Sequence, residues 1–263
     1  LVPHLPVAPD DTPSLVVVGT LADVVEDQFR RLFTDLGVGP VHFFPPRRAR
    51  DLPPIGRGTR VLLAQPFLSD TARALVARGA TLLTAPYPLG VQGTTAWLGA
   101  AATAFGVSHE TLERVTAPSA RRANTALARY RPWLDGKRLF LFPDSQLEIP
   151  IARFLHEECG MQLVEVGTPY LDRLLMDAEL SRLPEGVQVS EGQDVDRQLD
   201  PCREAQPDLT VCGLGLANPL EAEGLRTKWS IELVFSPVQG YEQAGDLAEL
   251  FARPLDRAQR LAV

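Results

Sequence analysis

Short β-branched apolar runs, each followed by a stretch of helical periodicity, constrain the fold of this 263-residue chain more than any other feature. The first run covers residues 15–18, and Gly19 ends it. Apolar residues then recur three and four positions apart from Val24 to Leu36, and Gly37 marks the end of the predicted helix. Strands that alternate with helices are joined by crossover connections and pair in parallel. The pattern predicts an α/β protein with doubly wound parallel sheets.

The alternation occurs twice and predicts two Rossmann-like domains, at residues 1–130 and 131–263, each of ordinary domain size. Strands are predicted at 15–18, 41–44, 60–64, 81–85, 138–142, 161–166, 187–189 and 208–212. The first domain ends in a helical bridge that begins near Ser108, where Pro118 is expected to break or kink the helix.

Charge and hydropathy exclude two classes of partner. The formal net charge is −7, which argues against a nucleic-acid-binding surface. The apolar runs have the length of strands and fall far short of the roughly 20 residues that a membrane helix needs. The chain starts without an initiator Met and without the features of a signal peptide, so we expect it to be the interior of a longer protein.

Three cysteines, Cys159, Cys202 and Cys212, are widely spaced. Their odd number argues against a disulfide framework and for a reducing, cytoplasmic location. Because no Cys-x-x-Cys motif occurs, no metal site is predicted within this chain. Core positions are the favoured interpretation for Cys159 and Cys212.

Two strand ends carry residues of interest, although neither identifies a catalytic residue. The turn at Gly213 and Gly215 follows a predicted strand, but the third glycine of a dinucleotide-binding pattern is missing, which favours a tight turn over a nucleotide site. Asp144 and Glu148 are four residues apart and could share a helix face as an acid/base pair, whereas capping of the helix by Asp144 or Ser145 is the favoured interpretation. No ATP-hydrolysing phosphate loop is present.

Trp229 forms i, i+4 pairs with Leu225 and Leu233 if a helix begins at Thr227. From the residues alone, a core tryptophan is favoured. The alternative is a flat aromatic wall that packs against a large planar ligand.

Family-specific blocks extend along the whole chain. They lie at 22–29, 43–48, 63–67, 93–97, 142–160, 164–170, 190–194 and 218–255. In these blocks the chain resembles the N subunit of light-independent (dark-operative) protochlorophyllide reductase, a relative of the nitrogenase α chain. The resemblance implies three Rossmann-like domains, of which this chain corresponds to the second and third.

The resemblance also implies a reaction and its partners. It implies the reduction of the ring D double bond of protochlorophyllide to chlorophyllide a in (bacterio)chlorophyll biosynthesis. An N2B2 heterotetramer with the B subunit would bind the pigment, and a transiently bound dimer of the ATP–Mg-dependent iron–sulfur L protein would supply electrons. Trp229, Leu225 and Leu233 would then be substrate-binding residues.

The [4Fe–4S] cluster of such a complex would be held by the first domain and the B subunit, and none of the three cysteines matches its ligands. We therefore expect this fragment alone to be inactive. Two other classes stay open. One is a paralogue with the same fold, either chlorophyllide reductase or a nitrogenase-cofactor assembly scaffold. The other is a non-enzymatic two-domain ligand-binding protein.

Overall fold

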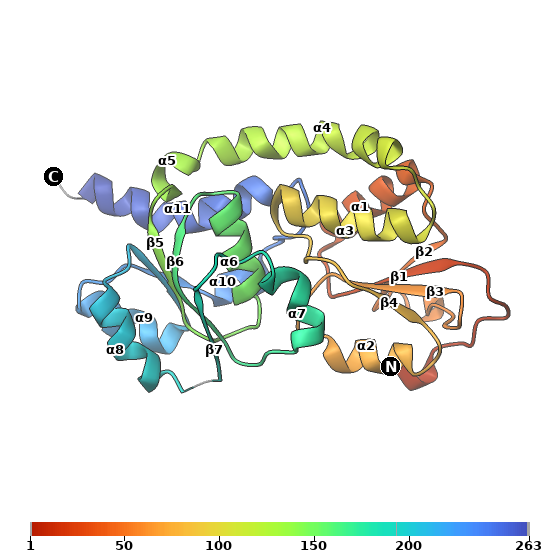
Figure 1. Ribbon diagram of the computed structural model, residues 1–263, viewed down its shortest axis with the longest axis horizontal. Helices are drawn as coiled ribbons and strands as arrows, with labels where there is room; N and C mark the ends of the chain where they lie inside the picture. The colour runs from red at the N-terminus through yellow and green to blue at the C-terminus, as the bar shows by residue number, and fades with distance from the viewer. Residues whose placement is uncertain (1, 193, 262–263) are drawn as a thin grey trace.

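Two parallel sheets lie side by side in the computed structural model, which describes residues 2–192 and 194–261 (Figure 1). The first has the order β2-β1-β3-β4 and the second the order β7-β6-β5-β8-β9. The strands are β1 (Ser14–Val18), β2 (Val41–Phe44), β3 (Thr59–Leu63), β4 (Thr81–Leu83), β5 (Arg138–Leu141), β6 (Gln162–Thr168), β7 (Gln188–Glu191), β8 (Leu209–Cys212) and β9 (Thr227–Trp229). Neighbouring strands pair in parallel in both sheets, which confirms the predicted fold class.

Helices cover both sheets and follow the strands in the predicted alternation. They are α1 (Asp23–Leu36), α2 (Ser69–Val76), α3 (Gly90–Ala104), α4 (His109–Ala128), α5 (Arg131–Leu134), α6 (Glu148–Glu157), α7 (Arg173–Leu180), α8 (Asp196–Ala205), α9 (Leu214–Ala222), α10 (Ile231–Phe235) and α11 (Ala244–Leu261). Single 3-10 turns occur at Val2–His4 and Ala49–Asp51. Gly37 ends α1 in the left-handed conformation with φ 73°, as the sequence predicts.

The long helix α4 begins as predicted but is not broken at Pro118. The Ser108 hydroxyl accepts a hydrogen bond from the backbone N–H of Thr111 at 3.2 Å and caps the helix. The helix then continues through Pro118 to Ala128. Pro118 and Arg114, whose carbonyl loses its usual donor, are both exposed, so water can reach that carbonyl. Packing of α4 on α1, α3 and α11 holds the helix together across this position.

The C-terminal helix α11 returns to the first unit and packs against α3, α4 and α5 (Figure 1). Just before it, the Gln28 side-chain amide donates to Gln243 Oε1 at 2.8 Å, and Arg31 pairs with Glu242 at 2.8 Å. The two sheets are therefore joined by a shared helical layer. The domain boundary at residue 130 stays a prediction. It separates the two sheets, but α11 from the second unit packs on helices of the first.

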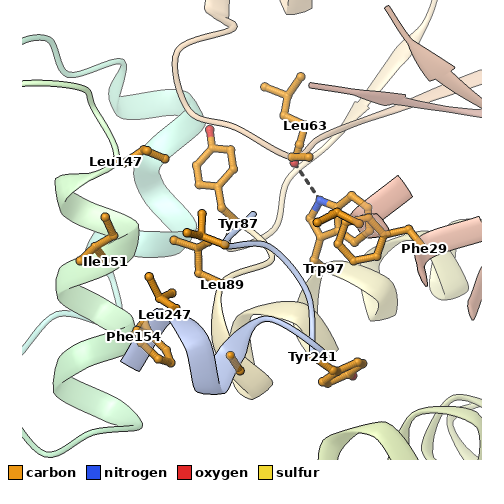
Figure 2. Close-up of a cluster of buried hydrophobic side chains, with 14 of the residues drawn as sticks. Phe29, Leu63, Tyr87, Leu89, Trp97, Leu147, Ile151, Phe154, Tyr241 and Leu247 are labelled. Atoms are coloured by element: carbon orange, nitrogen blue, oxygen red, sulfur yellow. Dashed lines mark hydrogen bonds between the residues drawn. The ribbon is translucent and has the colours of Figure 1, made fainter. Parts of the chain in front are cut away.

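The core of the first unit is organised around Trp97 of α3, which is completely buried. Its indole N–H donates to the carbonyl of Leu63 at the end of β3, at 2.8 Å (Figure 2). The rings of Phe29 and Phe33 lie 4.6 and 5.5 Å from the indole. These contacts dock α1 and α3 on one face of the sheet, because the aromatic rings fill the space while the indole nitrogen keeps its hydrogen bond.

Candidate functional site at the carboxyl edge of the second sheet

The strand order of the second sheet reverses between β5 and β8. The chain runs outward from β5 through β6 to β7, and then returns past β5 to β8 and β9. In open parallel sheets, ligands bind outside the carboxyl ends of the strands at such a point. Three segments meet this edge: the loop 142–147 after β5, Gly213 after β8, and Ser230 after β9.

Ser230 forms hydrogen bonds with the loop after β5 and with the end of β8. Its hydroxyl donates to the Asp144 carboxylate and also lies 3.1 Å from the carbonyl oxygen of Cys212. Its backbone N–H donates to the same carbonyl at 3.0 Å. Ser230 is buried, whereas Asp144 is exposed at this edge of the sheet. The expectation that Asp144 or Ser145 caps α6 is wrong, because Leu147 is the N-cap residue and no side chain caps this helix. The Asp144 side chain accepts from Ser230 instead.

The Glu148 carboxylate folds back on the loop that precedes it. Its Oε1 accepts from the backbone N–H groups of Asp144 at 2.9 Å and Ser145 at 2.6 Å, and from the Ser145 hydroxyl at 3.2 Å. Its Oε2 is buried without a hydrogen-bond partner, and burial raises the pKa of this carboxyl group. Asp144 precedes α6, so the two carboxylates do not share a helix face. Glu148 shapes the loop and has no contact with solvent that an acid/base role requires.

The turn after β8 lies close to the Asp144 carboxylate. Gly213 precedes the first residue of α9, and a Cβ added there would lie 3.2 Å from Asp144 Oδ1. A Cβ at Gly215 would meet no atom within 4 Å, so no close approach of backbone requires glycine there. A carboxylate beside the turn repels a phosphate, which supports the interpretation as a tight turn.

Trp229 belongs to a strand, so the condition for its i, i+4 pairs with Leu225 and Leu233, a helix that begins at Thr227, is not met. Residues Thr227–Trp229 form β9 on the open edge of β8, with Cys212 opposite Trp229. The unpaired backbone of β8 captures this segment, because strand pairing satisfies more hydrogen-bonding groups than a single helical turn would. The spacing of 225, 229 and 233 therefore spans a turn, a strand and a helix.

The three residues predicted to bind substrate separate into different environments. Leu225 packs in a small core with Phe140 and Phe142, whereas Leu233 lies in the main core. The two leucines are 6% and 3% exposed, while Trp229 is 41% exposed. The structure thus leaves the indole open to solvent and buries the two leucines in two different cores.

Four exposed apolar side chains, here called the apolar rim, belong to the segments at the ends of β8 and β9 and to α10. It comprises Leu214, Trp229, Val234 and Phe235. Phe235 is 81% exposed, an unusual value for such a large apolar side chain. The neighbouring Lys228 is buried and pairs with Glu232 of α10, so its charge does not interrupt the rim. This arrangement is suited to a flat apolar ligand or to a partner surface.

The three cysteines are buried core residues. Cys159 belongs to the main core, and Cys202 and Cys212 belong to the small core around Phe140. Burial raises the pKa of each thiol, and that of Cys212 to about 12. Thiols with raised pKa values are poor metal ligands because the thiolate is the ligating form. In the described residues no group of three or more His, Cys, Asp or Glu side chains could hold a metal ion.

A cavity at the carboxyl edge of the first sheet is too small for an organic ligand. It has a volume of about 10 Å³, room for about one water molecule, and Leu63, Leu83, Tyr87 and Leu175 contribute to its wall. Within the described residues, no helix is both long and apolar enough for a membrane span.

Sequence reasoning did not single out Ser230 or Arg153. A serine after a three-residue strand carries no motif, so its bond to Asp144 becomes visible only when β5 and β9 share one sheet edge. Arg153 gave a signal that could have been used. It interrupts the apolar stretch from Ile149 to Leu155 on a predicted helix, and a charge in such a place needs buried partners.

Comparison with known proteins places the chain among nitrogenase-like proteins. Residues 1–256 match the family described as nitrogenase component 1 type oxidoreductase. The chain is 69% identical over 264 residues to the light-independent protochlorophyllide reductase subunit N of Bradyrhizobium sp. (strain BTAi1), covering 100% of this chain and 62% of that protein. It is 66% identical to the subunit N of Halorhodospira halophila, covering 99% and 61%. The predicted resemblance is confirmed, and the chain spans about 62% of the length of such relatives.

Solved structures show the same fold at low sequence identity. Nitrogenase Cp1 at pH 6.5 superposes with a TM-score of 0.73 at 19% identity, over 100% of this chain and 64% of that chain. A Mn-bound periplasmic metal binding protein from Candidatus Liberibacter asiaticus gives a TM-score of 0.54 at 11% identity, over 93% and 99%. At these identities both likenesses concern the fold alone.

Proposed function

This chain belongs to the nitrogenase component 1 type oxidoreductase family, and we propose that it forms part of the N subunit of a light-independent protochlorophyllide reductase. One observation carries the proposal: 69% identity to such a subunit across the whole chain. The complete enzyme would reduce the ring D double bond of protochlorophyllide to chlorophyllide a in the cytoplasm. Because the chain spans 62% of that relative, the activity belongs to the longer protein and its complex.

The contribution of this chain to catalysis would be to bind and orient the pigment. The indole of Trp229 offers a flat apolar face to a planar macrocycle, and offset stacking adds about 0.5–1.5 kcal/mol to the effect of burial. Leu225 and Leu233 would support the indole from the buried side. The exposed Asp144 carboxylate, held by Ser230, is the polar group at the same sheet edge.

The residues of this chain do not fit a [4Fe–4S] cluster. A cluster needs thiolates that converge on one point, whereas Cys159 lies in a different core from Cys202 and Cys212, and burial favours the protonated thiols. The cluster would therefore be held outside this chain. ATP–Mg would act on the L protein, because the turn at Gly213 lacks a phosphate loop and faces Asp144.

Partner subunits would cover the apolar rim. An 81% exposed Phe235 beside Val234 and Trp229 leaves apolar area in water, which association with a ligand or subunit removes. We therefore infer that the pigment pocket is completed at the interface with the B subunit in an N2B2 heterotetramer, with the L protein docking transiently.

The test is reconstitution of the complex. The full-length subunit that contains this chain is co-expressed with B and L subunits, and chlorophyllide a formation is followed in the dark with ATP and a reductant. The expected result is turnover of protochlorophyllide that requires the L protein. Reduction of chlorophyllide in place of protochlorophyllide would assign the chain to the paralogous reductase, and pigment binding without turnover would indicate a binding or scaffold function.

A further inference from the structure

Arg153 of α6 is completely buried between the two sheets. Its guanidinium donates to Glu179 Oε2 at 2.7 Å, to the Tyr87 carbonyl at 3.2 Å and to the Leu89 carbonyl at 3.0 Å. Its Nη1 also lies 3.4 Å from Glu158 Oε1. The planar guanidinium group carries five N–H donors in a fixed arrangement, so this one side chain can contact two backbone carbonyls and two carboxylates.

The contacted carbonyls belong to a short extended segment, residues 87–89, here called the strap. The strap connects the first sheet to α3, and on this side the second unit contacts it through side chains of α6 and α7. Glu179 Oε1 accepts from the Tyr87 N–H at 2.6 Å. Glu158 accepts from the N–H groups of Val91 at 2.6 Å and Gln92 at 3.1 Å, at the start of α3.

Two glycines leave the space that this contact needs. A Cβ at Gly93 would lie 2.3 Å from the Arg153 guanidinium and 2.5 Å from the Tyr87 carbonyl oxygen. Gly90 adopts a φ of 70°, and a Cβ there would collide with Phe154 and Glu158. The close approach of α3 and α6 therefore depends on glycine at both positions.

The opposite side of the strap pairs with the segment that follows α10. Leu89 forms an antiparallel bridge with Gln239, and the Gly240 N–H donates to the Pro88 carbonyl at 2.7 Å. Leu89 itself packs in the same core as Phe154, Leu233 and Val238, and Figure 2 shows it close to α6. The strap is therefore held by Arg153 on one side and holds residues 238–240 on the other.

We propose that Arg153 is a positioning residue for the apolar rim, acting through the strap and the segment 238–240 on Trp229. The continuous chain from Trp229 through α10 to Gly240 is anchored at Ser230 on one end and at the strap on the other. Lys at position 153 keeps the charge but cannot contact both carbonyls and both carboxylates together. The strap then loses its fixed position, and the indole loses its orientation toward the ligand. The ligand is the planar pigment of the proposed function, on which this inference rests.

The experiment is a double-mutant cycle in the assembled complex of full-length subunits. Pigment affinity is measured by fluorescence for the wild type, Arg153→Lys, Trp229→Ala and the double variant. Arg153→Lys is expected to weaken binding about tenfold, and the double variant is expected to bind as weakly as Trp229→Ala alone, because the two residues act as one unit. Arg182→Lys is the control at the edge of the same charged cluster: Arg182 pairs with Glu157 and donates to the Gln92 side chain at 2.6 Å, whereas Arg153 donates to the backbone carbonyls of the strap.

Additive effects in the cycle, or unchanged affinity in Arg153→Lys, overturn the proposal. A wild-type complex that binds no pigment refutes the proposed function instead, and a second measurement then tests the positioning role by itself. Hydrogen exchange of full-length Arg153→Lys is expected to accelerate in residues 84–92 and also in 228–241. Acceleration confined to 84–92, with 228–241 unchanged, shows that the strap does not control the rim.

Discussion

The Ser230 hydroxyl donates a hydrogen bond to the Asp144 carboxylate and so joins the end of β9 to the loop after β5, across 86 residues of sequence. Ser230 also contacts the carbonyl of Cys212, so one small side chain connects three strand ends. This contact fixes the loop after β5 relative to β9, because neither the loop nor this three-residue strand is held by a long ladder of backbone hydrogen bonds.

Replacement of Ser230 by Ala is expected to destabilise this edge. The variant removes a buried hydroxyl and leaves Asp144 without its donor, which costs about 1–2 kcal/mol in the free energy of unfolding. Urea unfolding of the full-length subunit measures the change. Ser230→Thr, which keeps the hydroxyl, is the control and is expected to recover part of the loss. Equal stability of wild type and Ser230→Ala would show that the hydrogen bond contributes nothing.

The buried Glu148 is expected to make stability depend on pH. Burial raises its folded-state pKa above the ordinary value of 4.5, so between these two values the folded state binds more protons than the unfolded state. The contribution of Glu148 is full below the unfolded pKa and falls as pH rises through the folded pKa. The Glu148→Gln variant has no titratable group at this position, so its stability does not fall with pH for this reason.

The free energy of unfolding of Glu148→Gln relative to wild type should therefore increase as pH rises from the ordinary carboxyl value of 4.5 through the raised folded-state pKa of Glu148. Glu158 and Glu179 also have raised pKa values, but they are present in both proteins and cancel in the difference. A difference that stays constant with pH contradicts the assignment of the raised pKa to Glu148.

Gly93 and Gly99 provide a matched pair on α3. Ala at Gly93 forces a methyl group against Arg153 and the Tyr87 carbonyl, at a cost of about 2–3 kcal/mol in folding stability. Ala at Gly99 meets only Leu112 at 3.4 Å, so the better helix propensity of alanine is expected to leave stability unchanged or raise it by up to about 1 kcal/mol. Thermal unfolding of both variants tests the contrast, and similar melting temperatures would refute tight packing at Gly93.

Cysteine chemistry gives an independent prediction about the cluster. Because burial keeps Cys159, Cys202 and Cys212 protonated, these thiols should react slowly with a thiol reagent until the protein unfolds. Single Cys→Ser variants of the full-length subunit in its complex should keep the iron content of the wild type. Loss of iron in an assembled Cys→Ser variant would make that residue a cluster ligand.

Most of the fold could be predicted from local patterns because strands and helices here have clear periods. The run 15–18 followed by the amphipathic α1 and Gly37 is an example in which propensity, pattern and cap agree. The helix is not broken at Pro118, because the local cost of the proline is offset by tertiary packing of α4 and by an exposed carbonyl. The strand at Thr227–Trp229 was not predicted, because the helical spacing of residues 225, 229 and 233 competes with an open strand edge that the sequence alone does not display.

The candidate site was predicted less completely than the fold. The exposure of Trp229 could not be predicted, because it depends on the placement of β9 at the edge of the sheet. The contacts of Asp144 and Arg153 are with residues 86 positions away and with backbone carbonyls 64 to 66 positions away. No spacing rule covers such contacts, and only the sheet topology brings them together.

Pigment retention by Trp229→Ala in the assembled full-length complex tests the central claim most directly. Loss of the indole face is expected to weaken pigment binding about tenfold, since burial and stacking are both lost, while subunit assembly and iron content stay as in the wild type. Trp229→Phe should retain part of the affinity, and Val76→Ala, which trims a side chain of similar exposure on α2, should retain all of it. Normal pigment binding by an assembled Trp229→Ala complex would contradict the account, and failure of that variant to assemble would make Trp229 an interface residue instead.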